Sequence, residues 1–162
     1  MQTYEVDAGH GYRISDDASQ LDIDVIHDYL SHEGYWSLGR PRSAIVRSIE
    51  HSLNFGVYGP GGVQVGFARV VSDMTIFAYI CDVFVLTEYR GHGLSKALMA
   101  AMLDHPDLRG VRRWFLFTRD AHGLYEQFGF RVLDAPDRAM DRVNNGPLTE
   151  YYLDVIEGAG ER

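Results

Sequence analysis

The segment Arg-Gly-His-Gly-Leu-Ser-Lys, at residues 90–96, contains residue types that bind anions. Its two glycines can adopt positive φ angles and place no side chain in the way of an approaching phosphate. The helix expected to follow them opens with main-chain N–H groups that lack helical partners and carry partial positive charge. Three basic side chains lie in the same segment, one of them the only lysine of the chain. The segment therefore predicts a diphosphate cradle formed by Arg90, Gly91, His92, Gly93, Leu94, Ser95 and Lys96.

Two other nucleotide motifs do not fit this segment. A P-loop requires Gly-Lys-Ser/Thr at the start of the helix, and the segment lacks it. The dinucleotide-binding fingerprint requires a third glycine three residues after Gly93, where the chain has Lys96. The remaining alternative is a plain turn that begins a helix and binds no ligand.

A second segment, residues 118–130, has the sequence Thr-Arg-Asp-Ala-His-Gly-Leu-Tyr-Glu-Gln-Phe-Gly-Phe and follows the next expected strand. Together the two segments resemble the GNAT superfamily of N-acetyltransferases. Its phosphate motif, Arg/Gln-x-x-Gly-x-Gly/Ala, is matched by Arg90 and Gly93, with Ser95 in place of the last small residue. Its later motif, Asn-x-x-Ala-x-x-Leu/Phe-Tyr-x-x-x-Gly-Phe, is matched, with Thr118 replacing the asparagine, by Ala121, Leu124, Tyr125, Gly129 and Phe130.

The resemblance implies a reaction and its participants. The chain would move the acetyl group of acetyl-coenzyme A (acetyl-CoA) to a primary amine of a small molecule, by direct attack in a ternary complex and without a metal. Backbone N–H groups around Val83 and Val85 would polarise the thioester carbonyl and pair with the pantetheine arm, which Thr118 would also contact. Tyr125 would protonate the leaving thiolate, since a phenol with a pKa of about 10 keeps its proton at neutral pH.

The sequence leaves the base that deprotonates the acceptor amine open. Catalytic candidates are His122, one helical turn before Tyr125, and Asp82, a carboxylate in an otherwise apolar strand. The alternative for Asp82 is a buried acid bonded to the backbone or to an arginine. Cys81 is expected to be a small apolar residue and not a nucleophile, because no neighbour would lower its thiol pKa. Further candidate bases are Glu88, Asp73 and His51.

Aromatic residues are expected to contact the acceptor. In the GNAT superfamily the connection between the first two helices lines the acceptor cleft, and here it contains Tyr35 and Trp36. Phe77 and Tyr79 alternate on one face of the expected cofactor strand and would extend the same wall. Aromatic rings beside an acidic surface suit a cationic primary amine. The alternative for Tyr35 and Trp36 is an apolar plug that caps the helix.

Two other functions remain open for this fold. One is a non-catalytic acyl-CoA-binding sensor or regulatory module, which would show no turnover. The other is a protein or peptide N-acetyltransferase, which would need an open cleft where the loop with Tyr35 and Trp36 would otherwise close a pocket.

The hydrophobic periodicity places these residues on a defined series of elements. Strands are expected at 12–15, 54–58, 63–72, 76–86, 112–118, 130–133 and 150–155, and helices beginning after Ser19, near Pro41, at Leu94 and at Ala121. The strand at 76–86 is nearly all apolar, which predicts burial on both faces. The order β-α-α-β-β-β-α-β-α-β-β predicts an α/β (α+β) fold with a GNAT-like mixed, mostly antiparallel central sheet flanked by helices on both faces.

Length and composition predict a single acetyltransferase-like domain over residues 1–162, with residues 1–11 and 157–162 as flexible ends. The net charge of −8 disfavours nucleic-acid binding. No apolar stretch approaches the ~20 residues of a membrane span, and no signal peptide is recognised. With one cysteine, we expect a cytoplasmic protein. The resemblance also allows a homodimer.

Overall fold

The computed structural model describes residues 3–144, and the chain divides into two compact units, residues 1–117 and 118–162. The described part of the first unit contains a six-stranded sheet in the order β1-β2-β3-β4-β5-β6. Its strands are β1 (Glu5–Gly9), β2 (Tyr12–Ser15), β3 (Leu53–Tyr58), β4 (Gln64–Ser72), β5 (Phe77–Val85) and β6 (Arg113–Phe115). All neighbours are antiparallel except β5 and β6, which are parallel. The predicted mixed, mostly antiparallel sheet is therefore confirmed.

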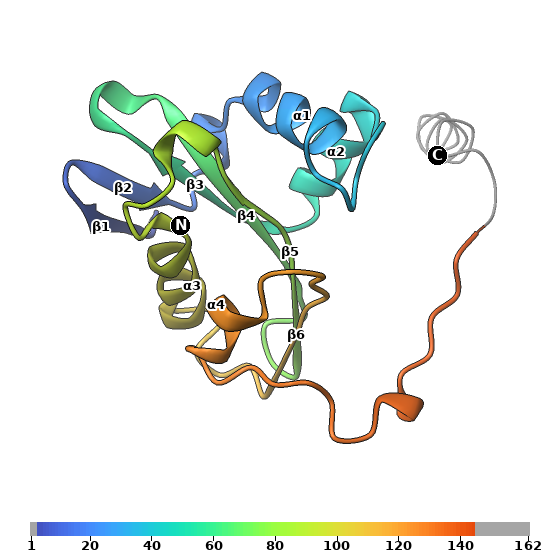
Figure 1. Ribbon diagram of the computed structural model, residues 1–162. Coiled ribbons are helices and arrows are strands. Elements are labelled where there is room, and N and C mark those ends of the chain that lie inside the picture. The colour runs from blue at the N-terminus through green and yellow to red at the C-terminus, as the bar shows by residue number, and fades with distance from the viewer. Residues whose placement is uncertain (1–2, 145–162) are drawn as a thin grey trace. The chain divides into compact units, whose positions relative to one another are not determined.

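Helices cover both faces of this sheet, as predicted (Figure 1). Helices α1 (Ile23–His32) and α2 (Arg42–Glu50) lie on one face, and α3 (Leu94–Asp104) lies on the other. α1 begins where the carboxylate of Asp22 accepts hydrogen bonds from two main-chain N–H groups of the first turn. α3 connects the parallel strands β5 and β6, which confirms the predicted βαβ unit.

Buried apolar side chains fix the helices to the sheet. On the α1–α2 face, the rings of Tyr29 and Phe84 stack with their centroids 4.0 Å apart. The same buried cluster contains Ile26, Leu30, Ile45, Ile49 and Phe67. α3 buries Leu98, Met99 and Met102. Each such side chain contributes about 1.5–3 kcal/mol relative to an exposed one, so both helical layers stabilise the sheet that they cover.

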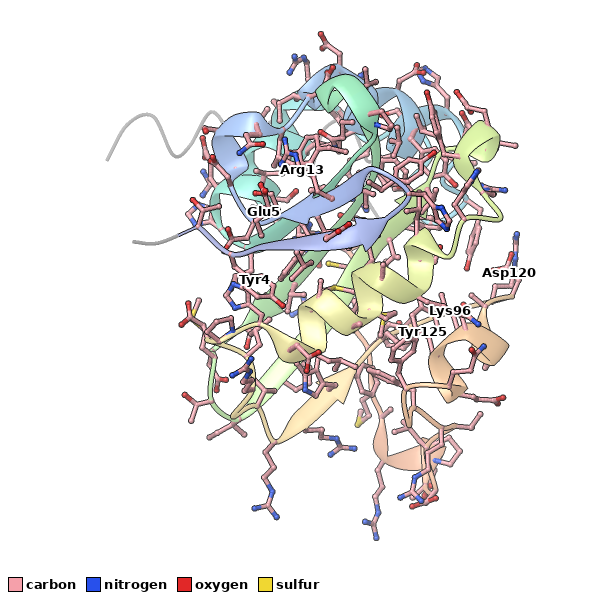
Figure 2. The ribbon with its side chains drawn as sticks, turned by 90° about the vertical axis from the view of Figure 1, so that its left-hand side faces the viewer. Tyr4, Glu5, Arg13, Lys96, Asp120 and Tyr125 are labelled. Atoms are coloured by element: carbon pink, nitrogen blue, oxygen red, sulfur yellow. The ribbon has the colours of Figure 1, made fainter. Side chains whose placement is uncertain are left out.

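The N-terminal residues form a strand, so the prediction of a flexible arm over residues 1–11 is wrong for residues 3–11. β1 pairs with β2 from Glu5 opposite Ser15 to Gly9 opposite Tyr12. Figure 2 shows Glu5 and Arg13 on these neighbouring strands, where their side chains form an ion pair of 2.8 Å. As a half-exposed edge strand, β1 lacks the apolar run that predicts a buried strand.

Two strand predictions need correction. β5 is not buried on both faces: its residues alternate, with Ala78 and Ile80 buried, Phe77 exposed and Tyr79 half-buried. On its less buried face the ring of Phe77 lies 6.4 Å from that of Phe115 on β6, so aromatic contacts replace helix packing there. The strand predicted at 130–133 is absent from the described part of the chain. The strand predicted at 150–155 and the flexible end predicted at 157–162 lie outside the described residues.

The second unit contains helix α4 (His122–Glu126), which begins one residue after the expected start at Ala121. Its start is fixed by Thr118, whose hydroxyl oxygen accepts a hydrogen bond of 3.0 Å from the N–H of Ala121. Over residues 3–144, no helix has both the length and the hydropathy needed to span a membrane.

The close approach of β4 to β5 requires a glycine at position 66, and this gives a first prediction. A Cβ on Gly66 would lie 2.8 Å from the carbonyl oxygen of Phe84 and 3.1 Å from Cγ2 of Val57. Gly66→Ala should therefore lower the free energy of unfolding by about 1–3 kcal/mol, as measured by urea denaturation. Gly110→Ala is the matched control, because a Cβ there meets no atom within 4 Å. It should change stability by less than about 0.5 kcal/mol. Equal effects of the two substitutions would contradict the close contact.

Candidate functional site

The turn between β5 and α3 has the backbone geometry of an anion cradle. Gly91 and Gly93 have φ angles of 84° and 74°, a left-handed conformation that residues with a Cβ rarely adopt. A Cβ on either glycine would meet no atom within 4 Å, so the space beside the backbone is open. No side chain caps the N-terminus of α3, where the N–H groups of Leu94, Ser95 and Lys96 lie. An anion can therefore reach main-chain donors along this turn.

The basic side chains of the turn differ in their contacts. Arg90 donates hydrogen bonds from Nε to the carbonyl oxygen of Val85 (3.1 Å) and from Nη2 to the hydroxyl of Tyr29 (3.3 Å). Its guanidinium therefore ties the turn to β5 and α1. His92 is exposed, and so is Lys96 at the first turn of α3 (Figure 2).

Next to this turn, one edge of β5 is unpaired by the residues that the structure describes. β6 pairs with β5 only from Phe77 opposite Arg113 to Tyr79 opposite Phe115. Beyond Tyr79, the part of the chain that the structure describes contains no strand paired to this edge of β5. Val83 and Val85 lie in this stretch of β5, as the resemblance implied. Such an edge can pair with the amides of an extended ligand in the manner of an added strand.

A β-bulge interrupts β5 at Asp82. Arg69 of β4 lies opposite Cys81 and Phe67 lies opposite Phe84, so two residues of β5 face a single residue of β4 between these pairs. Asp82 has a φ of 55°, which is uncommon for a residue other than glycine. The extra residue changes the direction of the side chain, a common role of bulges next to functional sites.

The Asp82 carboxylate is buried and accepts hydrogen bonds from three side chains. Arg40 donates from Nη1 to both oxygens (3.0 and 3.1 Å), and Arg69 donates from Nε to Oδ2 (2.9 Å). The indole N–H of Trp36 donates to Oδ1 (3.2 Å). Only 2% of the Asp82 side chain is exposed, against 17% for Arg40 and 13% for Arg69. We call these three charged residues the Arg40–Asp82–Arg69 cluster.

The electrostatics of this cluster argue against Asp82 as a general base. Burial by itself raises the pKa of Asp82, but the guanidinium groups of Arg69 and Arg40 outweigh burial and hold the pKa below its ordinary value of 3.8. A carboxylate that is ionised and bonded on both oxygens is a poor proton acceptor. The geometry favours the alternative, in which Asp82 is an acid paired with arginine.

The two neighbouring side chains on β5 remain protonated at neutral pH. Burial raises the pKa of the Cys81 thiol to about 12, although Arg69 partly opposes the increase. Burial also raises the pKa of Tyr79, with Cys81 and Asp82 raising it further and Arg69 and Arg40 lowering it. The strand register agrees with this: Tyr79 lies two residues before Cys81 on the same face of β5, and Cys81 lies opposite Arg69 of β4, so Tyr79 is a diagonal neighbour of Arg69. The high pKa also agrees with the expectation that Cys81 is not a nucleophile.

The predicted acceptor residues fall into two aromatic groups. The exposed rings of Tyr35 and Trp36 contact each other edge to face with centroids 5.0 Å apart, and Trp36 lies 6.5 Å from Tyr29 of α1. Phe77 instead contacts Phe115, and Tyr79 contacts Phe117 at 6.1 Å. Tyr79 nevertheless lies diagonally across from Arg69 of the cluster to which Trp36 is bonded. Among these four residues, Tyr79 and Trp36 are therefore linked through the charged cluster.

The remaining predicted residues belong to the second unit. Tyr125 is buried on α4, and its ring lies 6.0 Å from that of Phe130 in an edge-to-face arrangement. His122 is exposed at the first position of the same helix. The hydroxyl oxygen of Thr118 is engaged with the start of α4, as described above.

Sequence reasoning missed two residues of this site, Arg40 and Arg69. The signal for Arg69 was the one that selected Asp82, a charged residue within an apolar strand. Arg40 lies directly before Pro41 in the connection already assigned to the acceptor, so it also stood in a candidate segment. What the sequence did not contain was their pairing with Asp82 across 42 and 13 residues.

The buried cluster gives a stability prediction. Asp82→Asn leaves two largely buried guanidinium groups without their counterion, so the free energy of unfolding at pH 7 should fall by about 3–5 kcal/mol. Because the pKa of Asp82 is lower in the folded state, its ion-pair stabilisation is complete above its unfolded pKa of about 3.9 and is lost as the pH falls through the folded pKa. The stability difference between wild type and variant should therefore narrow below about pH 4.

Urea unfolding at pH 7, 5 and 3 measures this difference. The matched control is Asp24→Asn, which removes the exposed pair with Arg42 and should change stability by less than about 1 kcal/mol at any pH. A constant difference between wild type and Asp82→Asn from pH 7 to pH 3 would contradict the ionised, paired state of Asp82.

Comparison with known proteins agrees with this geometry. A solved structure of a GNAT-family protein from Xanthomonas campestris pv. campestris is 48% identical, with a TM-score of 0.81 over 85% of this chain and 96% of that chain. A protein of Gibberella zeae named as an acetyltransferase is 29% identical over 135 residues, 70% of this chain and 75% of the relative.

A third relative is serotonin N-acetyltransferase 2 of Oryza sativa subsp. japonica, a chloroplastic protein. It is 25% identical over 130 residues, which are 77% of this chain and 64% of that protein. Residues 22–130, more than half of the chain, match the acetyltransferase (GNAT) family, whose members use acetyl-CoA. The chain therefore belongs to the acetyltransferase (GNAT) family.

Proposed function

We propose that this chain transfers the acetyl group of acetyl-CoA to a primary amine of a small molecule, by direct attack in a ternary complex. The observation that carries the proposal is the combination, in one unit, of an open glycine turn at an uncapped helix with the free edge of β5. The turn supplies donors for a diphosphate, and the edge supplies partners for an amide-containing arm. Coenzyme A contains both a diphosphate and an amide-containing pantetheine arm, so a protein that binds it needs both kinds of contact.

The residues present fit this co-substrate. The diphosphate site consists of the main chain at Gly91 and Gly93 and the first N–H groups of α3, with Lys96 and His92 as nearby basic side chains. Arg90 acts by fixing the turn, since its guanidinium is bonded to Val85 and Tyr29. When bound, acetyl-CoA supplies an acetyl group activated as a thioester. Ser95 stands where the family motif has glycine or alanine, and its hydroxyl adds a further donor.

Carbonyl polarisation is assigned to the main chain of β5. An N–H group of Val83 or Val85 donates a hydrogen bond to the oxygen on which negative charge develops during attack. The bulge at Asp82 supports this assignment, because it disrupts the regular ladder directly before Val83. The stacked pair of Phe84 and Tyr29 and the bond from Arg90 to Val85 hold this part of β5 in place.

Proton transfers are assigned to side chains of the second unit. Tyr125 matches the general acid of the family motif and protonates the leaving thiolate from its phenol. Thr118 supports the start of α4, on which Tyr125 lies, and its contact with the cofactor arm remains part of the proposal. His122 is retained as the candidate base that accepts the proton of the amine, directly or through water. Asp82 is assigned a positioning role instead, for the electrostatic reasons given above.

The acceptor site is assigned to Tyr35, Trp36 and Tyr79, with Phe77 farther along the same strand. Exposed aromatic rings suit a small organic amine. The rice relative, named for serotonin, makes aromatic amines the first probes to test. The family match at 22–130 includes residues of both units, so we propose that residues 1–162 work as one domain. The single cysteine is consistent with a cytoplasmic enzyme. A homodimer remains part of the proposal.

Binding of coenzyme A gives the first test of this function. Coenzyme A at about 100 times its Kd should stabilise the folded chain by about 2.7 kcal/mol, and so raise the Tm by about 5–10 °C. Gly93→Glu should abolish this shift, because it places bulk and negative charge in the cradle. Gly61→Glu is the matched control: Gly61 has a φ of 83° and equally open surroundings, but it lies in the β3–β4 turn. That variant should keep the shift. Absence of any shift in the wild type would refute the proposal.

Turnover tests the assignment of Tyr125. Tyr125→Phe should lower kcat by about 100-fold or more while the coenzyme A shift in Tm is retained, because only the proton donor is removed. Cys81→Ser should keep kcat, since direct attack uses no acetyl-cysteine. Loss of turnover in Cys81→Ser, together with an acetylated wild-type enzyme, would contradict direct attack. A wild type that binds coenzyme A and acetylates no amine or peptide would indicate the sensor function instead.

A further inference from the structure

We propose that the acceptor carries an anionic group in addition to its amine, and that Arg40 and Tyr79 bind this group. This inference rests on the proposed acetyl transfer and specifies its substrate class. It is carried by the unused donors and the local positive charge around the Arg40–Asp82–Arg69 cluster.

Arg40 uses only part of its hydrogen-bonding capacity. Its Nη1 atom makes the bonds to both oxygens of Asp82. Over residues 3–144, neither Nε nor Nη2 of Arg40 forms a hydrogen bond, and 17% of the side chain is exposed. A guanidinium has five N–H donors in a planar fork, so one edge remains for a carboxylate or a phosphate. The pair with Asp82 already fixes the side chain, which reduces the entropy lost on binding.

Arg69 does not compete for this role. Its Nε and Nη2 both lie 2.9 Å from Oδ2 of Asp82, and its Nη1 donates to the hydroxyl of Ser52 (2.9 Å). All three nitrogens of its guanidinium are thus engaged within the protein. Arg69 neutralises Asp82 and fixes its position. Of the two arginines, Arg40 is therefore the one that keeps unpaired N–H donors.

Tyr79 adds a second donor beside the cluster. Its pKa is raised, chiefly by burial, so the phenol keeps its proton at neutral pH. No hydrogen bond of its hydroxyl is found among the described residues. Tyr79 pairs with Val71, the second residue after Arg69 on β4, so it lies diagonally across from Arg69 on the same face of the sheet. Because Arg69 and Arg40 bind the same carboxylate, this register places Tyr79 near the position where an anion bound to Arg40 would lie.

The local charge favours an anion over a cation. Two arginines and one aspartate give a net charge of +1 in a largely buried setting, whereas the whole chain carries −8. In this low-dielectric setting, the interaction of an anion with the cluster is stronger than its interaction with the surface charges, which salt and water screen. A simple cation, which the sequence suggested for the aromatic loop, is therefore disfavoured beside this cluster. The aromatic rings of Trp36 and Tyr35 instead provide an apolar wall beside the charge.

The cluster also lies beside the reacting groups of the proposed mechanism. Asp82 directly precedes Val83, whose N–H is a candidate donor to the thioester oxygen. An acceptor anchored by its anionic group at Arg40 would therefore be held close to β5, where its amine is needed. Such anchoring converts binding energy into orientation of the attacking group.

Matched pairs of amines test the inference. Tryptophan is compared with tryptamine, and glucosamine 6-phosphate with glucosamine, so that each pair differs only in the anionic group. Turnover is followed by thiol release from acetyl-CoA, and any further amine that is accepted is compared with its anionic counterpart. The anionic member of a pair should have a kcat/KM at least about tenfold higher, the value of one charge-assisted hydrogen bond. The pair that shows the preference identifies carboxylate or phosphate as the anion.

Variants test whether Arg40 and Tyr79 cause this preference. Arg40→Gln should raise KM for the anionic acceptor by about tenfold or more and bring the two members of a pair close to equal. Arg40→Lys should restore part of the preference, because it keeps the charge but not the fork. Tyr79→Phe leaves all ion pairs intact and should reduce the preference severalfold, which provides a test if Arg40→Gln fails to fold. Arg42→Gln, two residues away in an exposed pair with Asp24, is the matched control and should keep the preference.

The outcomes separate this inference from the proposed function. A coenzyme A shift in Tm accompanied by equal kcat/KM values within every pair would overturn the inference and leave acetyl transfer intact. Retention of the full preference in both Arg40→Gln and Tyr79→Phe would overturn the assignment to these residues. Absence of turnover with every amine would refute the proposed function itself.

Discussion

The ion pairs between the buried carboxylate of Asp82 and the guanidinium groups of Arg40 and Arg69 join the α1–α2 connection to two neighbouring strands of the sheet. Arg40 lies in the connection between α1 and α2, Arg69 lies on β4 and Asp82 lies at the bulge of β5. One carboxylate therefore links a loop and two strands. Removal of a single partner would leave charge buried without compensation, which is the costly arrangement. This interdependence accounts for a positive φ at Asp82, because the ion pairs supply the energy that holds an unfavourable backbone conformation.

The same bulge also divides β5 into two functional parts. Before it, Ala78 and Ile80 pack into the core and Phe77 to Tyr79 pair with β6. After it, the strand continues to Val85 with a free edge and leads into the glycine turn. An unpaired strand edge exposes N–H and C=O groups that can pair with another chain, so it normally favours aggregation. In the proposed function that edge is a binding surface, and the adjacent helix start is kept without a side-chain cap for the same reason.

Features of this fold that depend on residues close together in the sequence could be predicted, and features that depend on contacts between distant segments could not. The βαβ unit, the two helices before β3 and the glycine turn follow from periodicity, capping residues and glycine placement within a few residues of sequence. β1 was missed because an edge strand of mixed polarity lacks a periodic apolar signal. The bulge and the cluster were missed for another reason: they depend on the register of β4 against β5 and on contacts across 42 residues, which no local pattern encodes. A charged residue in an apolar strand did identify Asp82 as unusual, and the same test applied to Arg69 would have suggested its partner.

The contrast between the charge of the whole chain and the charge of the cluster has a consequence for acceptor selection. An amine with a carboxylate is a zwitterion at neutral pH, so it has no net charge to be repelled by a chain of −8, and an amine with a phosphate keeps only a small negative net charge. Its ammonium is favoured by the acidic exterior, while its anion is favoured by the local excess of positive charge at Arg40. Simple anions are disfavoured by the first field, and simple cations are disfavoured by the second. Because the long-range field is screened beyond about 8 Å at physiological salt, the final choice is made at short range by Arg40 and Tyr79. In the proposed function, specificity then arises from two opposed electric fields that act on the two ends of one small molecule.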